Sequence, residues 1–417
     1  MKKRIAFAFL ALVAGFFLFR ELKGEFIDWY ADNVFVRKTA YPSSEQPDQI
    51  TLTWSDDPQT TQTINWRTSP AVDTGTVEFR TVGDGDGPVQ TVVATKAILE
   101  DALLENDPLN HRFTARLTGL TPDTPYEYRV GNGNTDGWSD WVEFRTAPGP
   151  DKPFSFVYMG DPQKGLGFWG GLVQKSFERC PQSAFYVIAG DLINSGNFRN
   201  EWDALFRGGT GVFDRRALVP APGNHDYDNQ NQLRLYLSVF GLPENGPEEL
   251  PKEHAYSFTY GNALFVVLDS NQPPGLQTSW LEKQLAESKA TWKFAVYHHP
   301  AYPSAPHRAN EDVKKLWGDL FDKYHVDMAL QGHDHAYLRT YPMKGGKRAA
   351  SAAEGTYYMV AVSGTKFYEQ IYREYSEVAF PQVSTYQVID ISTHPDKLTY
   401  RAYDIDGIVK DELIIEK

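Results

Sequence analysis

The sequence predicts an all-β domain followed by a larger α/β domain. Short runs with period-two alternation fill residues 45–148, and continuous apolar runs separated by helical patterns fill residues 149–417. Several of these apolar runs are followed directly by residue types that bind metals. The 417 residues are long enough for both domains, since a domain commonly holds about 150 residues.

Residues 1–24 predict export. Three basic residues at positions 2–4 precede an uncharged apolar run over residues 5–19. This run is short for a transmembrane span and long for the apolar part of a cleaved signal peptide, so both interpretations stay open. We favour a membrane anchor, because no small-residue cleavage motif follows Phe19. Either way, the positive-inside rule places the rest of the chain in the periplasm or outside the cell, with residues 25–44 as a linker.

Residues 45–148 are predicted to form a β-sandwich, because their strands alternate with clusters of Gly, Pro and Asp. The segment Leu120–Tyr126 resembles the tyrosine corner of fibronectin type III domains, in which a tyrosine hydroxyl is tied to the backbone. We therefore expect a fibronectin III-like sandwich that ends at Ala147–Pro150. The predicted strands are 51–54, 63–66, 76–80, 112–117, 126–130 and 141–145.

Residues 149–417 are predicted to form sheets covered by helices, because apolar strands alternate with helical segments. The predicted helices are 169–180, 198–206, 232–240, 279–288 and 310–324. The predicted strands are 155–159, 184–189, 218–220, 263–268, 294–297 and 327–330, and strand character returns at 356–363, 385–391 and 398–403.

Charge and cysteine content exclude several kinds of partner and site. The chain has 41 basic and 54 acidic residues, a formal net charge of −13, so we expect no nucleic-acid-binding surface. Its single cysteine, Cys180, excludes intramolecular disulfides and cysteine-based zinc sites. A metal would therefore be bound mainly by nitrogen and oxygen atoms.

Five predicted strands are followed within one to three residues by metal-ligand residue types. The carboxyl ends of strands are where α/β folds bind ligands, and a glycine before the ligand permits a tight turn. Each motif alone is weak, but five in this order indicate a metal centre. The segments are Gly160–Gln163, Gly190–Asn194, Gly223–Asp226, Tyr297–Pro300 and Gly332–His335.

This ordered set resembles the calcineurin-like metallophosphoesterase superfamily, and with the preceding sandwich it is most similar to the purple acid phosphatase branch. The resemblance covers roughly residues 45–417. It implies a metallophosphoesterase fold, in which a β-sandwich of mixed sheets flanked by helices holds two metal ions. It also implies that Asp191 bridges both ions, that the first ion is bound by Asp161 and His335, and that the second is bound by Asn224, His298 and His333.

Two positions depart from the family pattern. Purple acid phosphatases have a tyrosine three residues after the bridging aspartate, and this chain has Asn194 there. Because that tyrosinate stabilises ferric iron, its absence predicts two divalent ions of manganese, zinc or iron. Many superfamily members have histidine two residues after the first aspartate, where this chain has Gln163. Gln163 is predicted as a neutral metal ligand, and hydrogen bonding to another ligand is the open alternative.

Two residues beside the ligands are predicted to act in catalysis. His225 follows Asn224 and is placed to donate a proton to the leaving oxygen or to bind the phosphate. Asp226 is expected to orient the His225 imidazole, and a turn-forming role is the alternative. His299 is interpreted as structural, because the family spacing selects His298 and the next residue of an extended segment points to the other face.

The predicted function is therefore the hydrolysis of phosphate esters outside the cytoplasm. Two divalent ions about 3.5–4 Å apart can activate a water and neutralise the attacking and leaving oxygens. The domain pairing favours a small-molecule phosphomonoester, as in acid phosphatases. The alternative, a phosphodiesterase or nucleotide-pyrophosphate hydrolase, is favoured by Gln163. The third possibility, a non-catalytic surface binding protein, would require the loss of metal ligands. Of the family's ligands, only the tyrosine at the position of Asn194 is missing, which argues against this possibility.

Overall fold

The computed structural model describes residues 34–83, 88–134 and 137–417. The predicted export segment and residues 25–33 of the predicted linker lie outside the described residues. In the part that is described, no helix is long and apolar enough to cross a membrane. Residues 34–44 are bound to the N-terminal domain, since the Arg37 amide donates to the Leu103 carbonyl over 2.7 Å and the Ser43 hydroxyl donates to Asp107 over 2.6 Å.

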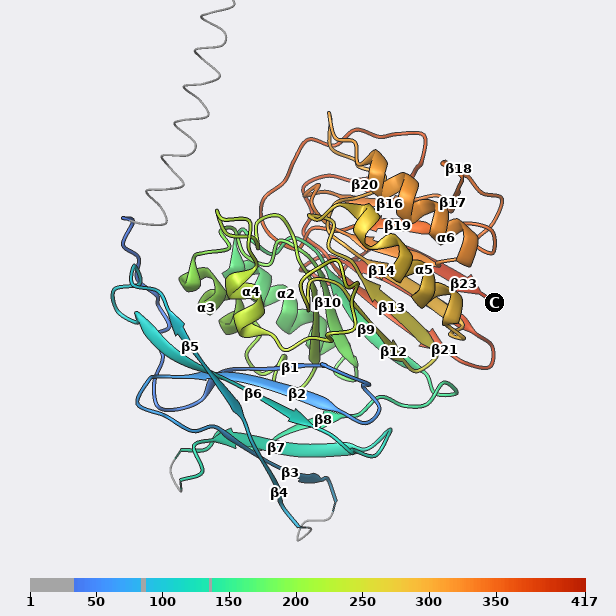
Figure 1. Cartoon of the computed structure of the whole chain (residues 1–417). Helices are drawn as coiled ribbons and strands as arrows, with labels where there is room; N and C mark the ends of the chain where they lie inside the picture. The colour runs from blue at the N-terminus through green and yellow to red at the C-terminus, as the bar shows by residue number, and fades with distance from the viewer. Residues whose placement is uncertain (1–33, 84–87, 135–136) are drawn as a thin grey trace, which may run out of the picture.

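The N-terminal domain is all-β, as predicted, and consists of two four-stranded antiparallel sheets (Figure 1). The Tyr126 hydroxyl accepts a hydrogen bond from the Thr121 amide over 2.9 Å, which is the contact expected of a tyrosine corner. One sheet has the order β1 (Asp48–Thr53), β2 (Gln62–Thr68), β6 (Leu109–Leu117), β5 (Thr95–Glu100), and the other β4 (Gln90–Val93), β3 (Thr76–Thr81), β7 (Pro125–Gly131), β8 (Val142–Arg145).

The larger domain is built on two mixed sheets. They pack face to face through aromatic side chains, with the ring of Phe156 5.2 Å from that of Phe265 and 5.3 Å from that of Phe294. The first sheet has the order β11 (Ala217–Ala221), β10 (Phe185–Ala189), β9 (Phe154–Met159), β21 (Tyr386–Ser392), β22 (Lys397–Tyr403), β23 (Val409–Glu416). The second has the order β12 (Tyr256–Tyr260), β13 (Ala263–Val267), β14 (Trp292–Val296), β15 (Met328–Gln331), β19 (Tyr357–Val360), β16 (Tyr337–Thr340), β20 (Ser376–Phe380).

Helices flank this sandwich, which confirms the predicted fold class. Helices α2 (Leu166–Arg179), α3 (Arg199–Gly208) and α4 (Arg234–Val239) lie beside the first sheet, and α5 (Thr278–Glu287) and α6 (Gly318–Tyr324) pack on the second (Figure 1). The remaining short elements are η1 (Pro274–Leu276), the π-helical turn η2 (Val313–Trp317) and the hairpin β17 (Met343–Lys344) and β18 (Lys347–Arg348).

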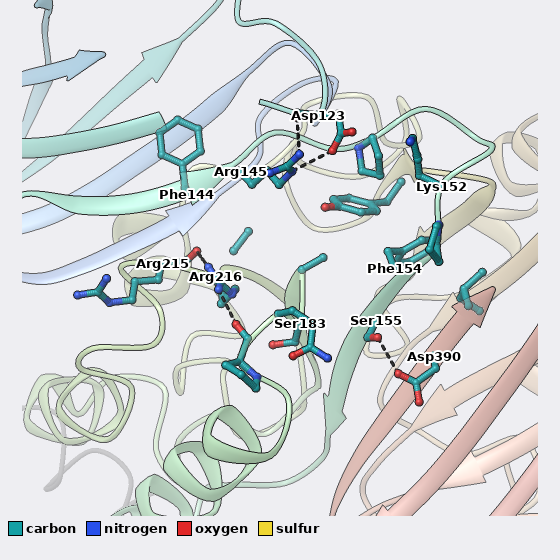
Figure 2. A pocket seen from close by; sticks show the side chains of 18 of the residues that line it. Asp123, Phe144, Arg145, Lys152, Phe154, Ser155, Ser183, Arg215, Arg216 and Asp390 are labelled. Carbon is teal, nitrogen blue, oxygen red and sulfur yellow. Dashed lines mark hydrogen bonds and ion pairs between the residues drawn. The ribbon is translucent and has the colours of Figure 1, made fainter. Parts of the chain in front are cut away.

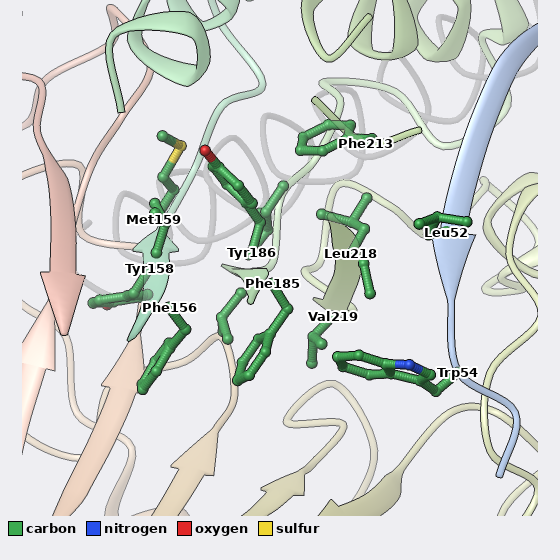
Figure 3. Packing of buried hydrophobic residues seen from close by; sticks show 14 of the residues in the cluster. Leu52, Trp54, Phe156, Tyr158, Met159, Phe185, Tyr186, Phe213, Leu218 and Val219 are labelled. Atoms are coloured by element: carbon green, nitrogen blue, oxygen red, sulfur yellow. The ribbon is translucent and has the colours of Figure 1, made fainter. Parts of the chain in front are cut away.

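The two domains share one hydrophobic core, in which β1 of the first domain lies beside β11 of the second (Figure 3). Trp54, directly after β1, is buried against the larger domain, with its ring 5.5 Å from that of Phe185 and 5.7 Å from that of Tyr260. The Leu52 amide also donates to the Phe213 carbonyl over 2.8 Å. These contacts fix the N-terminal domain against the sheet whose strands lead to the candidate site.

Candidate metal centre

The predicted ligands meet where strands of both sheets end. Strands β9, β10 and β11 are parallel neighbours, as are β13, β14 and β15, so the residues directly after them are brought together. The residues placed in this way are Asp161 after β9, Asp191 after β10, Asn224 after β11, His298 after β14, and His333 and His335 after β15.

The close approach of these loops depends on glycine. A Cβ atom at Gly190, whose φ is 85°, would lie 2.5 Å from Nδ1 of His298. A Cβ atom at Gly223 would lie 2.1 Å from the backbone nitrogen of Asp191. Asp161 and Asp191 themselves have φ values of 50° and 52°, in the left-handed region that most residues avoid. Strain of this kind is often retained at functional sites.

One group that could hold a metal consists of Asp161, Asp191 and His335, whose candidate ligand atoms lie within 4.8 Å of one another. Gln163 joins this group, because its Nε2 donates to Asp191 Oδ2 over 2.9 Å and lies 2.9 Å from His335 Nε2. Oδ1 of Asp161 and Oε1 of Gln163 are buried without a hydrogen-bond partner. Two unpaired acceptor oxygens inside a polar cluster suit a cation.

A second group consists of Asp191, His298 and His333, also within 4.8 Å of one another. Nδ1 of His298 donates to the Ala189 carbonyl over 2.9 Å, so Nε2 faces the site, 3.2 Å from Asp191 Oδ1 and 3.2 Å from Asn224 Oδ1. Nδ1 of His333 lies 3.1 Å from the same Nε2 atom. Asp191 therefore belongs to both groups, which is the arrangement expected of a bridging ligand.

Burial and neighbouring charges shift the pKa values of several side chains in both groups. Burial, together with Asp191, raises the pKa of Asp161 well above its usual range. Burial lowers the pKa of His298, but the adjacent Asp191 outweighs it and raises the pKa to about 9. Burial lowers the pKa of His335 to about 3, which leaves a neutral imidazole with a free lone pair. Buried carboxylates among imidazoles and amide oxygens form a donor set that suits manganese, zinc or iron.

His225 lies beside the second group, and its neighbour Asp226 has another role than expected. The His225 amide donates to Asp191 Oδ1 over 2.9 Å, and Nδ1 of its ring donates to the Asn194 carbonyl over 2.7 Å. The carboxylate of Asp226 is fully buried and accepts from the amides of Leu192 over 2.8 Å and Gly223 over 2.7 Å. This corrects the expectation that Asp226 orients the imidazole, because the ring of His225 contacts the Asn194 carbonyl instead. The hydrogen bond from the Gly223 amide, three residues earlier, fits the turn-forming alternative.

The remaining basic residues near the site make structural contacts. Nδ1 of His299 lies 2.9 Å from the Ser270 hydroxyl, and its ring packs 4.2 Å from that of His333. Arg308 donates from Nη1 to the His333 carbonyl over 2.6 Å and to Asp334 over 2.8 Å.

The loop after β19 contributes two residues that the sequence reasoning did not identify. The Lys366 carbonyl accepts a hydrogen bond from Nδ1 of His335 over 3.0 Å, which turns Nε2 towards the site. The ring of Tyr368 lies edge-on to His335 with 4.7 Å between centroids. Both residues are six or more residues beyond the end of β19 at Val360, so the search for ligand types directly after strands did not identify them.

Comparison with known families decides the relationship. Residues 154–337 match the family model of the calcineurin-like phosphoesterases, and residues 47–146 match that of the N-terminal domain of purple acid phosphatases. The larger domain is therefore similar to calcineurin-like phosphoesterase domains, and the N-terminal domain is similar to that of purple acid phosphatases. The order of the two matched domains resembles that of the purple acid phosphatase branch.

Individual relatives agree with this placement. An uncharacterised protein of Mycobacterium tuberculosis is 29% identical over 329 residues, which are 69% of this chain and 60% of that protein. The Fe(3+)-Zn(2+) purple acid phosphatase 12 of Arabidopsis thaliana is 26% identical over 244 residues, 52% of this chain and 50% of the relative. The chain thus spans 50% to 60% of the length of these relatives. The fold is shared with a purple acid phosphatase from yellow lupin seeds, with a TM-score of 0.74, 20% identity, and coverage of 89% of this chain and 74% of that one.

The chain has no tyrosine at position 194, and the hydroxyl groups of two tyrosines on neighbouring strands contact other groups. Asn194 donates from its side chain to the Ser195 hydroxyl over 3.2 Å. The Tyr158 hydroxyl donates to the Gln331 carbonyl, and the Tyr186 hydroxyl lies 3.1 Å from that of Ser176.

A pocket of about 650 Å³ opens beside the second candidate metal-binding group. Its lining includes Asn224 and His299 from the strand ends and the exposed carboxylates of Glu311 and Asp312. No lysine or arginine is among the described residues that line it. The pocket therefore offers amide, hydroxyl and carboxylate groups to whatever extends from the centre.

Proposed function

We propose that this protein is a binuclear-metal phosphoesterase that hydrolyses small phosphate monoesters. The observation that carries the proposal is the position of Asp191, which belongs to both metal-ligand groups. Bound there, two ions would supply Lewis-acid activation of water and neutralise charge on the phosphoryl oxygens. Asp161, Gln163 and His335 would hold one ion, and Asn224, His298 and His333 the other.

His225 is proposed to serve the leaving group. Its Nδ1 proton is donated to the Asn194 carbonyl, which fixes the ring and leaves Nε2 for the substrate. A protonated Nε2 can hydrogen-bond a phosphoryl oxygen or donate its proton to the departing alkoxide. Asp226 supports this arrangement indirectly, because it ties the loop of His225 to the loop of Asp191.

The pocket beside Asn224 favours an uncharged alcohol part in the substrate. Its exposed carboxylates, Glu311 and Asp312, would repel the second phosphate of a nucleotide pyrophosphate, and no described basic side chain in the lining would offset this. This is an argument against the nucleotide-pyrophosphate alternative.

The metal pair is proposed to be divalent. One relative is named a Fe(3+)-Zn(2+) purple acid phosphatase. In this chain, however, Asn194 stands where a tyrosinate would stabilise ferric iron, so manganese, zinc or ferrous iron fits better. Export through residues 1–24, with or without membrane anchoring by residues 5–19, is part of the same proposal.

The test is a substrate panel assayed with the full chain after removal and re-addition of manganese, zinc or iron. We expect metal-dependent turnover of p-nitrophenyl phosphate that exceeds turnover of bis-p-nitrophenyl phosphate and of ADP. Turnover that is equal with and without metal would refute the proposal. Faster hydrolysis of the diester or of ADP would favour the alternative class.

A further inference from the structure

A second cavity, of about 1070 Å³, lies where the N-terminal domain meets the larger domain (Figure 2). Its lining includes Phe154 at the start of β9 and Ala217 at the start of β11. The predicted metal ligands follow the opposite ends of these strands. Asp161 is seven residues beyond Phe154, so at about 3.3 Å per residue the cavity lies about 20 Å from the candidate metal centre. The two sites are therefore separate.

The wall of this junction cavity combines aromatic side chains with positive charge. The aromatic part is the cluster of Trp54, Phe154 and Tyr260, in which the ring of Tyr260 lies 5.7 Å from that of Trp54 and 5.0 Å from that of Phe154. The lining contains six basic and three acidic side chains, although the whole chain has a net charge of −13. The basic ones are Arg145, Lys152, Arg215, Arg216, Lys397 and Arg401, and the acidic ones are Asp123, Glu143 and Asp390.

Part of this positive charge is already neutralised by carboxylates. Nε of Arg145 lies 2.9 Å from Asp123 Oδ1, and Nε of Arg401 lies 2.7 Å from Glu412 Oε1. Arg215 approaches Asp214 only to 4.0 Å. In Figure 2 its side chain points away from the other labelled residues.

Unlike Arg145 and Arg401, the half-buried Arg216 of the cavity lining has no carboxylate partner among the described residues. Its guanidinium donates to two backbone carbonyls, those of Arg215 over 2.8 Å and Pro181 over 2.5 Å, and it forms no ion pair with any described acidic residue. Burial lowers the pKa of this guanidinium, as expected for a charge that lacks a counterion. In Figure 2 the Arg216 side chain lies among the labelled residues, between Arg145 and Ser183.

Two lysines of the lining also lack a counterion. The ammonium groups of Lys152 and Lys397 make no hydrogen bond or ion pair with a described residue. Lys152 precedes β9 and Lys397 begins β22, so positive charge reaches the cavity from separate elements of the larger domain. An anion in the cavity would be attracted by Arg216 and both lysines.

We propose that the junction cavity binds a small organic anion that carries an aromatic ring. Its charged group would lie against Arg216, and its ring against Trp54, Phe154 and Tyr260. The volume suits a small molecule, since ligand pockets commonly measure about 300–1,000 Å³. A carboxylate, sulfonate or phosphate group on the ring would satisfy the same contacts, because each can accept two guanidinium N–H bonds.

Such a ligand would contact both domains and would therefore stabilise the folded chain. Trp54 belongs to the N-terminal domain, and Arg216 and Phe154 belong to the larger one. A compound that binds only the folded state raises the midpoint of thermal unfolding, and the stabilisation grows with the logarithm of its concentration above Kd.

The test uses anilinonaphthalene sulfonate, an aromatic anion that is not a phosphate ester, titrated into the full chain with fluorescence and thermal unfolding as readouts. We expect one site and a higher unfolding midpoint. Arg216→Gln, which keeps hydrogen-bonding capacity at the backbone carbonyls, should weaken binding about tenfold or more. If Arg216→Gln fails to fold, the double variant Lys152→Gln/Lys397→Gln, at two more accessible positions, should weaken binding about threefold or more.

The matched control is Lys283→Gln/Lys315→Gln, which removes two exposed charges outside the cavity lining and should leave the affinity unchanged. The variant Asp191→Asn should also bind the probe normally, whether or not the phosphoesterase proposal holds. Loss of binding in Asp191→Asn would locate the probe at the metal centre and overturn this inference. Equal affinity in all variants, or no saturable binding, would overturn it as well.

Discussion

At the scale of single residues, Asp191 contacts candidate site residues of both metal-ligand groups. Its two carboxylate oxygens contact different partners, Oδ1 with His298 and the His225 amide, and Oδ2 with Gln163. A carboxylate in this position can serve two cations, whereas a neutral side chain of the same size cannot compensate both charges. The same residue therefore joins the two ligand groups and the loop that carries His225.

Replacement of His225 should affect rate more than metal content. In His225→Ala we expect kcat to fall about 100-fold or more, because a general acid typically contributes that factor, while both ions stay bound. Steady-state kinetics and metal analysis of the same preparation measure the two effects. A His225→Ala protein that has lost its metals would instead make the imidazole a ligand.

The protein should lack the purple colour of the enzymes it resembles. The colour requires a tyrosinate on ferric iron, position 194 holds asparagine, and the Tyr158 and Tyr186 hydroxyls contact other groups. The visible spectrum of iron-loaded, air-oxidised protein should show no strong charge-transfer band. A strong band that survives Asn194→Ala would mean that another tyrosine reaches the metal.

Most candidate site residues could be predicted from the sequence, because they follow buried strands, and in four of the five segments a glycine stands before the first ligand. The structure brings together all seven predicted ligands, and their role as ligands stays a prediction. The contact of Asp226 with the Leu192 amide could not be foreseen, since it depends on how two loops pack after folding. Lys366 and Tyr368 could not be predicted either, because they contact His335 from a loop without regular secondary structure.

At the scale of elements, the strands that the sequence reasoning missed are mostly edge strands. β4 and β5 lie at sheet edges and are largely exposed, so they lack the buried alternation that marks a strand. β20 and β23 are edge strands too. Central strands such as β10 and β14 are almost fully buried, and their apolar runs identified them.

Strand β2 and helix α3 are joined by a buried ion pair between the two domains. Arg67 of β2 is fully buried, with Nη1 2.8 Å from Asp203 of α3 and Nε 2.8 Å from Asp48. Asp203→Ala should lower the free energy of unfolding by about 3–5 kcal/mol, because it leaves part of a buried charge unpaired. Urea denaturation measures this loss. The exposed pair of Lys323 and Glu282 supplies the control, since Glu282→Ala should change the midpoint far less. Equal effects of the two variants would refute the claim that the buried ion pair stabilises the fold.

The segment at the start of η2 should set the charge preference for substrates. Replacing Glu311 and Asp312 by lysine should raise kcat/KM for ADP about threefold to tenfold relative to p-nitrophenyl phosphate, since the pocket would change from acidic to basic. The ratio of the two kcat/KM values, measured at low ionic strength, is the readout. The matched control is Asp140→Lys, a charge reversal at an exposed site in the N-terminal domain. An unchanged ratio in the Glu311/Asp312 variant would show that the pocket does not receive the substrate.

At the scale of the whole molecule, the two sheets of the larger domain create the candidate site by ending together. One sheet supplies Asp161, Asp191 and Asn224, and the other supplies His298, His333 and His335. The N-terminal domain lies at the opposite end of β9, β10 and β11, held by Trp54 and Arg67. The candidate metal centre and the junction cavity therefore lie at opposite ends of the same strands.

The central claim is that two metal ions share Asp191, and metal stoichiometry tests it most directly. Metal analysis of the full chain, saturated with manganese or zinc and freed of excess metal, should give two ions per chain. The Asp191→Asn variant should lose stoichiometric metal and phosphatase turnover, while Asp140→Asn, which changes an exposed carboxylate of the N-terminal domain, should retain both. Two tightly bound ions in Asp191→Asn would contradict the account.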